Sequence, residues 1–552
     1  MSLNSIALEI VWVRLVSIVD EASRLLTRAA FSLIVREAHD FVVVLLDRKG
    51  ENLAQGSKTI PAFTLAASAV AKACLKKIAP ESLRPGDLII SNDPWISTGH
   101  QFDVTLLAPI FKSGRLIGYA VSITHWSEIG GRGWTLFSRD YFEEGLVIPI
   151  ARLSEGGIPN ELVHAFIREN VRNPDNVFAD LAAQRGALDL VQEKVVRLLE
   201  EFQHEDLQEI AAQIHARSEA AMRQAIERLP DGTHSHTLRI DGVDGTLQLR
   251  TTVTVQGSSM RVDYAGTSPQ SSHAINSVLN YSAGYTLFAV KSVLCPQVPN
   301  NDGINRAIDV TAPTGTIVNP AKPAGLVARN VVGFFCAEAT LGALRRFAPD
   351  RVPAGSPTTW IINVDVLPAD GAPLRNFQMF LNGGLGAHAR EDGRHCCLYP
   401  SSVQNTPIEI IEREFPVRFL TKEYRPGSGG AGRHRGGHGQ VVEMQALAPM
   451  RITCISTAID NPPQGAEGGT AGQAGAILID GKPLLGRAAV DWRPGEQVTL
   501  LLPGGGGFGD PDTRSAAAVA RELRDGFVEV GAATGNAQSA DAQHGITSKG
   551  HT

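Results

Sequence analysis

Cysteine is scarce in this chain of 552 residues, and its scarcity excludes several kinds of site. The six cysteines form no C-x-x-C pair, so the spacing of a structural zinc site is absent. Cys396 and Cys397 are adjacent, and we interpret the segment "RHCCLYP" as a strand or loop with buried thiols. So few cysteines are typical of a reduced, cytoplasmic protein.

A large excess of positive or negative charge is also lacking. The 51 basic and 57 acidic residues give a formal net charge of −6, and Lys and Arg are scattered through the chain. A nucleic-acid binder needs a basic face that neutralises phosphates. We therefore expect no nucleic-acid partner, and a small molecule as the substrate.

Long apolar runs are missing as well. No run reaches the roughly 18 residues that span a bilayer. The first apolar stretch carries Glu9 and Arg14 and has no basic leader, so it is not a signal peptide. We expect no membrane partner.

The length of the chain and its pattern of helical and strand-like segments predict an α+β protein of several domains, with mixed sheets. At 552 residues the chain is too long for one hydrophobic core. Helical spacing predicts a first helix over residues 4–30. Its buried face is expected to consist of Leu8, Val11, Leu15, Ile18, Ala22 and Leu25.

Composition shifts predict where the domains lie. Residues 1–230 form a domain with the candidate metal site and a helical extension, for which Asn173 or Asp175 is a candidate helix cap. Residues 231–405 form an α/β domain that includes a helix over 273–295, and residues 406–515 form a β-rich, Gly-rich domain. Residues 531–552 have almost no bulky apolar side chains, which predicts a disordered tail.

Three polar residues at the ends of apolar runs form the candidate site. In "STGHQFDVTLLAPIF", His100 precedes Asp103 by three residues, and the next apolar run ends in "THWSEIGG" at His125. The two runs join through a Ser-Gly turn, which predicts an antiparallel hairpin. If the turn centres near Gly114, Asp103 lies opposite His125, about 4.5–5.5 Å away between Cβ atoms. A slip of one residue would place them on opposite faces.

Two imidazoles and a carboxylate suit manganese, iron or zinc, with positions left for water or substrate. The alternative is that His100 caps a turn, Asp103 begins a strand and His125 packs against Trp126. Spacing alone leaves both interpretations open.

Many short segments, in the same order, resemble the B subunits of the ATP-dependent hydantoinase/oxoprolinase family, which includes the α subunits of acetone carboxylase. The resemblance runs from about residue 5 to about residue 515. It is carried by "FSLIVREAHDF", "GDLIISNDPWISTGHQFDVTLLAPIF", "HWSEIGG", "YFEEGLVIPIARL", "ENVRNPDNVFADLAAQ", "VPNNDGINRAIDV", "VARNVVG", "RPGSGGAGRHRGGHG" and "PGGGGFGDP".

The resemblance implies that His100, Asp103 and His125 hold a divalent metal, which is manganese in the acetone carboxylase relatives. All three ligand types are kept in this chain. Trp126 and Glu128 depart from the residues common in the family, so the pocket and the substrate are expected to differ.

Two glycine-rich segments have competing interpretations. "PGGGGFGDP" contains a formal G-x-G-x-x-G at Gly504, Gly506 and Gly509, but no βαβ unit with a ribose-binding acid follows it, and Gly-Lys-Ser/Thr is absent. We interpret these glycines as permitting tight turns or a close approach to a neighbouring loop. "RPGSGGAGRHRGGHG" is interpreted as an exposed loop that packs on its glycines, with anion binding as the alternative.

Further polar residues are candidates for the chemistry. Asp40 in "REAHDF" is the candidate general base, with Glu37 beside it, and the alternative is that Asp40 pairs with Arg36 or caps a turn. Others are candidates for contacting the substrate or orienting a ligand, although a helix cap is an equal interpretation of two of them, Asp93 and Asn330. This group is Asn92, Asp93, Glu128, Arg329 and Asn330.

The resemblance implies a division of labour between two subunits. ATP and magnesium are expected on an A-type, ATP-binding partner, in a hetero-oligomer such as a heterotetramer, and the metal of this chain would act on the activated carbonyl. The first hypothesis is an ATP-dependent hydrolase of a cyclic amide such as a hydantoin, 5-oxoproline or another lactam. The second is a subunit of an ATP-dependent ketone carboxylase, and the third is a scaffold subunit without catalysis.

Overall fold

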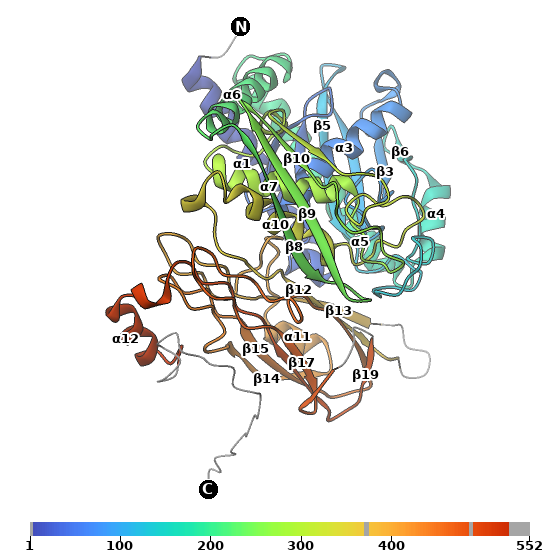
Figure 1. The fold of residues 1–552 in the computed structure, drawn as a ribbon. Helices are drawn as coiled ribbons and strands as arrows, with labels where there is room; N and C mark the ends of the chain where they lie inside the picture. Colours follow the sequence, from blue (N-terminus) through green and yellow to red (C-terminus); the bar gives the residue numbers. More distant parts are fainter. Residues whose placement is uncertain (1–3, 369–374, 485–488, 529–552) are drawn as a thin grey trace.

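The computed structural model describes residues 4–368, 375–484 and 489–528, and the predicted disordered tail lies outside these ranges. Within them the chain has helices and several separate sheets, which confirms the α+β prediction. The helices and strands of the first two thirds of the chain lie above the β-rich C-terminal part, which ends in α12 (Figure 1). None of the described helices is long and apolar enough to cross a bilayer.

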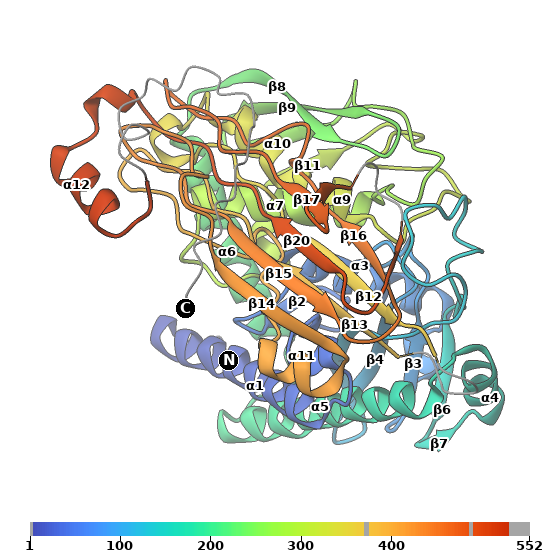
Figure 2. The same cartoon turned by 90° about the horizontal axis from the view of Figure 1, so that it is seen from below.

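A seven-stranded sheet organises the N-terminal part, with the strand order β2-β1-β5-β4-β3-β6-β7. Helices α1 and α5 pack side by side against it, along the lower edge of Figure 2, and α3 contacts β1, β4 and β5. The elements are α1 Ser5–Ala29, α2 Leu33–Arg36, β1 Phe41–Leu46, β2 Asn52–Gln55, α3 Pro61–Lys77, β3 Leu88–Ser91, β4 Asp103–Lys112, β5 Arg115–His125, β6 Ala151–Glu155, β7 Ile158–Pro159, α4 Glu161–Asn170, α5 Pro174–Glu201 and α6 Gln208–Glu227.

The first helix shows how well the spacing of apolar residues predicts which side chains are buried. Asn4 caps α1 by accepting a hydrogen bond from the Ala7 backbone N–H. The predicted buried face is correct except at Leu25, which is 36% exposed, while Leu26 is buried. Because 3.6 residues make a turn, the contact stripe drifts along a helix of this length, and Leu26 replaces Leu25 on it. At the start of α5, Asn173 holds the cap position without a side-chain hydrogen bond.

The middle part is a four-stranded sheet, β11-β10-β9-β8, packed against α10. The helix predicted over 273–295 begins only at Leu279, because Asn276 binds the carbonyls of Ser271, His273 and Gly325 and holds the preceding segment irregular. The elements are β8 Gly232–Asp241, β9 Thr246–Gln256, β10 Ser259–Asp263, α7 Leu279–Leu294, α8 Asp302–Asn305, β11 Ile308–Thr311, α9 Asn330–Gly333 and α10 Phe335–Leu344.

The C-terminal part has two sheets, β13-β12-β16-β19 and β14-β15-β20-β17-β18, which share a second hydrophobic core. Side chains from β12, β13 and β16 also belong to the large core of the N-terminal part, so the two parts are packed together. The elements are β12 Trp360–Val366, β13 Arg375–Leu381, α11 Ile408–Glu414, β14 Val417–Tyr424, β15 Gln440–Ala446, β16 Met450–Ile455, β17 Ala476–Ile479, β18 Lys482–Pro483, β19 Val490–Trp492, β20 Gln497–Leu501 and α12 Ala516–Arg524. The three-domain division stays a prediction.

Glycine-rich segments pack backbone against backbone beside these sheets. Gly430 donates to the Gly505 carbonyl, Gly505 to Gly437, and Gly437 to Leu385. A Cβ on Gly436 would lie 2.0 Å from the Gly505 oxygen, so only glycine fits there. The predicted close approach is confirmed, but the "RPGSGGAGRHRGGHG" segment is mostly buried, and the prediction of an exposed loop is wrong. Hydrogen bonds to neighbouring backbones satisfy its peptide groups.

The predicted burial of the cysteine pair is also partly corrected. Cys396 and Cys397 lie in a loop, and both are half-buried rather than fully buried. Burial raises the pKa of Cys396 to about 12, so its thiol is protonated at neutral pH.

Candidate metal centre

The predicted hairpin brings Asp103 and His125 together. Strands β4 and β5 pair antiparallel with Asp103 opposite His125, so the predicted register is confirmed. Strand β1 pairs with the other edge of β5, and the His125 backbone N–H donates to the Asp40 carbonyl at 3.1 Å. The ends of three strands therefore meet at one point, and His100 reaches it from the loop before β4.

The three predicted ligands form one buried cluster. Asp103 Oδ1 lies 2.9 Å from His100 Nε2 and 3.2 Å from His125 Nδ1. One ligand atom from each residue lies within 4.8 Å of the others. His100, Asp103 and His125 are 1%, 0% and 2% exposed, respectively. The cluster is thus shielded from bulk water.

Unsatisfied nitrogen atoms indicate that this cluster fits a metal. Within the described residues, His125 Nε2 has no hydrogen-bond partner, and His100 Nε2 makes no well-oriented hydrogen bond, although Asp103 Oδ1 lies 2.9 Å away. Buried polar atoms are normally hydrogen-bonded, so two such atoms in one cluster require an explanation. His100 Nδ1 contacts the Val327 carbonyl at 3.2 Å, which fixes the ring proton there and leaves the Nε2 lone pair free. Two imidazoles and a carboxylate are a suitable ligand set for manganese, zinc or iron.

The protonation states also suit metal binding. Burial lowers the pKa of His100 to about 3, assisted by the Arg329 charge, so its ring is neutral at pH 7. Burial opposes ionisation of Asp103, but the contact with His100 and the positive charge of Arg329 outweigh it and hold the Asp103 pKa well below its ordinary value. A neutral imidazole and an ionised carboxylate are the forms that bind metals.

Arg329 fixes the Asp103 carboxylate. Its Nη2 lies 2.6 Å from Asp103 Oδ2, and its Nε donates to the Thr98 carbonyl. The Thr98 hydroxyl donates to the same carboxylate oxygen at 2.5 Å. The Arg329 guanidinium also lies over the Tyr281 ring, 4.3 Å from its centre. Oδ2 is thereby engaged, and Oδ1 is left to face the two histidines.

Asp40, the predicted general base, lies beside this cluster. Its Oδ2 is 3.9 Å from His125 Nδ1, and its buried Oδ1 has no hydrogen-bond partner among the described residues. Burial raises the pKa of Asp40 to about 6. The alternative pairing with Arg36 is absent, because Arg36 binds Glu37 and Glu414 instead.

A small cavity of about 30 Å³ adjoins the cluster. That volume is enough for one water molecule. Asn330 lines it, and neither polar atom of the Asn330 side chain has a partner in the described part of the chain. The other walls are largely aromatic, and β12 and β13 close the C-terminal side; they include Phe63, Trp134, Tyr281, Tyr285, Ile361, Gln378 and Phe380.

Three predicted residues lie outside this cavity lining. Asn92 is buried and binds the backbone of Gln101, Leu146 and Ile148. Asp93 accepts a hydrogen bond from the Trp95 N–H. Glu128 accepts from the Gly130 N–H and pairs with Arg172 at 2.7 Å. Their contacts hold loops around the cluster.

Glu144 is a site residue that the sequence reasoning missed. It is fully buried and accepts hydrogen bonds from the Leu326 and Val327 N–H groups at 2.5 and 2.9 Å. It therefore holds the segment that supplies the Val327 carbonyl to His100 and carries Arg329. Burial raises the Glu144 pKa to about 8. The doublet "EE" gave no means of separating buried Glu144 from exposed Glu143.

The sequence pattern also did not predict the aromatic rings that surround His125. Phe102 stacks on the His125 ring with 5.3 Å between centres and 9° between planes, and Trp134 stacks at 5.7 Å. The predicted packing partner, Trp126, is buried but makes no ring contact with His125 among the described residues. These rings fix the orientation of the imidazole.

A second group of potential ligands has its charges satisfied by the protein. Asp47, Glu51 and His215 approach one another, but Arg306 pairs with Glu51 at 2.8 Å. Asp47 accepts backbone N–H groups of Lys49 and Glu51. We interpret it as a structural ion-pair network.

The fold and the buried cluster together define a class: a large α+β protein with a buried His–Asp–His cluster, suited to binding a metal, at the ends of a hairpin and enclosed by a β-rich C-terminal part. Residues 4–511 match the sequence profile of one family, described as Hydantoinase B/oxoprolinase. The chain belongs to this family.

Curated relatives are similar over nearly the whole chain. An uncharacterized protein of Methanocaldococcus jannaschii is 30% identical over 96% of this chain and 94% of its own length. A putative B subunit of a D-/L-hydantoinase from a Pseudomonas species is 28% identical over 95% and 93% of the two chains. The beta chain of the caprolactamase from Pseudomonas jessenii is 28% identical over 92% and 91%.

Solved structures share the fold. The crystal structure of the ATP-dependent caprolactamase from Pseudomonas jessenii matches 97% of this chain and 96% of its own, with a TM-score of 0.87 and 25% identity. An acetone carboxylase structure without nucleotide matches 94% of this chain and 78% of its own, with a TM-score of 0.82 and 18% identity. The second likeness concerns the fold alone.

Proposed function

We propose that this chain is the metal-binding B-type subunit of an ATP-dependent hydrolase that opens cyclic amides. The observation that carries the proposal is the buried triad of His100, Asp103 and His125, in which His125 Nε2 has no hydrogen-bond partner among the described residues and the Asp40 carboxylate lies beside it. Relatives named as parts of a hydantoinase and of a caprolactamase support the substrate class.

The chemistry of the substrate explains the need for ATP. A lactam carbonyl is resonance-stabilised, and phosphorylating its oxygen makes the carbon a better electrophile. A divalent metal at the triad would supply Lewis acidity toward the activated carbonyl or water. Addition of water to the carbon, cleavage of the ring C–N bond and protonation of the nitrogen would leave an acyl phosphate. A second water would then hydrolyse it to the amino acid and inorganic phosphate.

The residues of this chain would prepare that step. Asp40 would accept a proton from water through its unpaired Oδ1, because with a pKa of about 6 it is largely ionised at pH 7. Arg329 holds Asp103 in position for the ligand role. The aromatic walls would exclude bulk water from the activated carbonyl.

ATP chemistry is assigned to a partner in this proposal. The G-x-G-x-x-G of residues 504–509 is packed against neighbouring backbones, which leaves no cradle for phosphates. ATP and Mg²⁺ would bind an A-type subunit in a hetero-oligomer such as a heterotetramer, and a cytoplasmic complex fits the sparse cysteines. In Pestalotiopsis fici, a 5-oxoprolinase aligns with this chain over only 42% of its own length, so that relative has room for another module.

A ketone carboxylase is the second candidate. The likeness to an acetone carboxylase structure favours it, although at 18% identity that likeness concerns the fold. The same triad would then orient a carboxylating species in place of water.

Product analysis separates the two candidates. The chain would be co-purified with an A-type subunit and screened for ATP turnover over lactams and ketones in the presence of ¹³C-bicarbonate. We expect one lactam to stimulate ATP turnover and to yield an amino acid without ¹³C. Incorporation of ¹³C into a ketone would overturn the hydrolase assignment. Full activity of His100→Ala and His125→Ala complexes would leave only a scaffold role.

A further inference from the structure

A second polar cavity lies in the glycine-rich C-terminal part, away from the residues assigned to the metal triad. It measures about 220 Å³ and is lined by His395, Arg435, His438, Arg521, Glu522 and Phe527, among others. We propose that this cavity binds a small monocarboxylate.

The two histidines present hydrogen-bond donors to the cavity. His395 Nδ1 accepts the His438 backbone N–H at 2.9 Å, and His438 Nδ1 accepts the Gly429 N–H at 3.2 Å. An imidazole whose Nδ1 accepts must, when neutral, carry its proton on Nε2. Neither Nε2 has a partner within the described ranges, so each is available to an acceptor.

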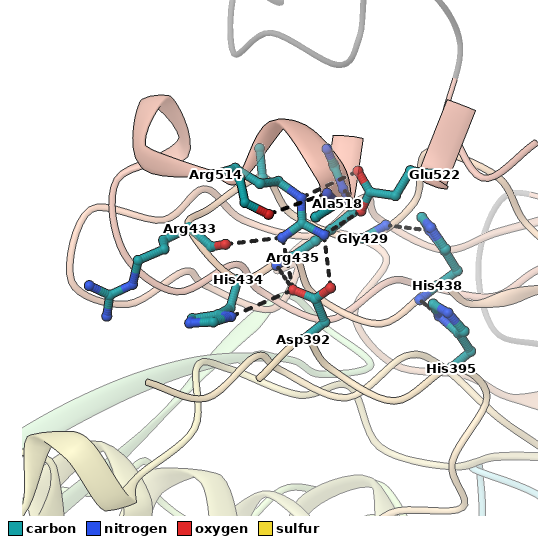
Figure 3. A network of polar contacts seen from close by, with 12 residues as sticks. Asp392, His395, Gly429, Arg433, His434, Arg435, His438, Arg514, Ala518 and Glu522 are labelled. Carbon is teal, nitrogen blue, oxygen red and sulfur yellow. Dashed lines mark hydrogen bonds and ion pairs between the residues drawn. The ribbon is translucent and has the colours of Figure 1, made fainter. Parts of the chain in front are cut away.

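Ring packing holds both imidazoles in place. The His395 and His438 rings stack with 4.9 Å between centres and 13° between planes, and Phe527 stacks on His438 at 5.3 Å. Figure 3 shows the two rings side by side at the edge of the ion-pair network. Burial lowers the pKa of His438 to about 4, so the ring acts as a neutral donor at pH 7.

Arg435 supplies two further donors. It is only 5% exposed, and its Nε binds Glu522 Oε1 at 2.8 Å. Its two terminal nitrogens have no hydrogen bond to any described residue, although the side chain lines the cavity. A buried guanidinium with free terminal N–H groups presents the planar fork that binds carboxylates.

The neighbouring acids do not compete for these donors. Arg514 lies between Asp392 and Glu522 and binds both carboxylates, at 2.8 and 2.6 Å (Figure 3). Arg435 and Arg514 thus balance Asp392 and Glu522, and the lining also contains one further residue of each sign, Arg521 and Asp525. A cavity with neutral net charge and an excess of donors favours a monoanion over a phosphate dianion.

Acetate is a suitable probe for this site. We would titrate it against the full chain, stripped of metal by a chelator, and follow saturation transfer to its methyl signal by NMR. We expect saturable binding with one dissociation constant. Arg435→Gln and His395→Phe should each raise that constant at least tenfold, because each removes donors, and His395→Phe keeps a ring in the stack.

Arg433→Gln is the matched control. Arg433 is exposed, outside the cavity lining, and bound to the Ala389 carbonyl, so acetate affinity should stay within twofold. Thermal unfolding checks that the variants are folded. If Arg435→Gln does not fold, the acetate affinity of His395→Phe decides whether the cavity binds carboxylate. Absence of saturation in the wild type, unchanged affinity in the folded variants, or displacement of acetate by inorganic phosphate at a lower concentration would overturn the assignment.

Discussion

Asp103 is the residue on which the metal centre depends, because it contacts both histidines and the only buried cation described beside them. Its Oδ1 faces His100 and His125, and its Oδ2 is held by Arg329 and Thr98. The hairpin pattern permitted Asp103 and His125 to meet, and the family resemblance implied the triad with His100, because spacing alone left the register uncertain by one residue. Arg329 is 226 residues away in sequence, so its contact with Asp103 was not predictable from local pattern.

Asp40 provides a test of the proposed base. Asp40→Asn keeps the shape of the side chain but removes the proton acceptor. We expect turnover of the reconstituted complex to fall by about 10²–10⁴-fold, with metal content unchanged. Steady-state kinetics and elemental analysis measure the two effects.

The control for this substitution is Asp189→Asn, at an exposed position on α5. It should leave turnover within twofold. An Asp40→Asn complex as active as the wild type would remove Asp40 from the mechanism.

Glu144 gives a prediction about pH and stability. Its pKa is about 8 in the folded protein against 4.5 for an unperturbed glutamate. Below pH 4.5 both folded and unfolded chains hold the proton. Above pH 4.5 the unfolded chain ionises while the folded chain keeps the proton, so the stability contributed by this group is lost progressively until the pH has passed 8, where the folded chain ionises too.

Glu144→Gln removes that dependence, and its amide oxygen still accepts the two backbone N–H groups. Between pH 5 and pH 8, we expect the free energy of unfolding of the variant to fall by about 3 kcal/mol less than that of the wild type. Denaturant midpoints at several pH values measure the difference. Parallel pH profiles for the two proteins would refute the role of burial.

At the scale of elements, two apolar runs joined by a Ser-Gly turn correctly predicted the hairpin of β4 and β5. Burial in the glycine-rich segments was not predictable, because it results from contacts between backbones far apart in sequence. Gly429–Gly439 lies between the segments around Leu385 and Gly505, and no side-chain pattern encodes that neighbourhood.

Gly436→Ala tests this packing. The new Cβ would lie 2.0 Å from the Gly505 carbonyl oxygen, so a backbone must move. We expect a loss of roughly 3 kcal/mol or more of stability, seen as a lower unfolding temperature. Gly186→Ala is the control, because Gly186 lies in α5 with nothing within 4 Å of its Cβ position. It should stabilise the protein by about 0.5–1 kcal/mol, and equal effects of the two substitutions would contradict the account.

At the scale of the whole molecule, the proposed metal centre lies where distant parts of the chain meet. The N-terminal hairpin supplies Asp103 and His125, the segment before α9 supplies Arg329, and β12 and β13 close the cavity. The sequence predicted an α+β fold and the ligands, but this enclosure depends on how separate parts pack, which periodicity does not encode.

Because the centre joins these parts, metal binding should stabilise the whole fold. A ligand that binds only the folded state at 1,000 times its dissociation constant adds about 4 kcal/mol. We expect a chelator to lower the unfolding temperature of the full chain and Mn²⁺ or Zn²⁺ to restore it. His125→Ala should show neither change, and an identical response in that variant would place the stabilising ion elsewhere.

Metal content is the most direct test of the central claim that His100, Asp103 and His125 hold a divalent metal. The purified wild type and the His100→Ala, His125→Ala and Asp40→Asn variants would be compared by elemental analysis after gel filtration. The account predicts about one manganese, zinc or iron ion per chain in the wild type and in Asp40→Asn, and loss of that ion in both histidine variants. A metal-free wild type that takes up none of these ions, or full occupancy in both histidine variants, would contradict it.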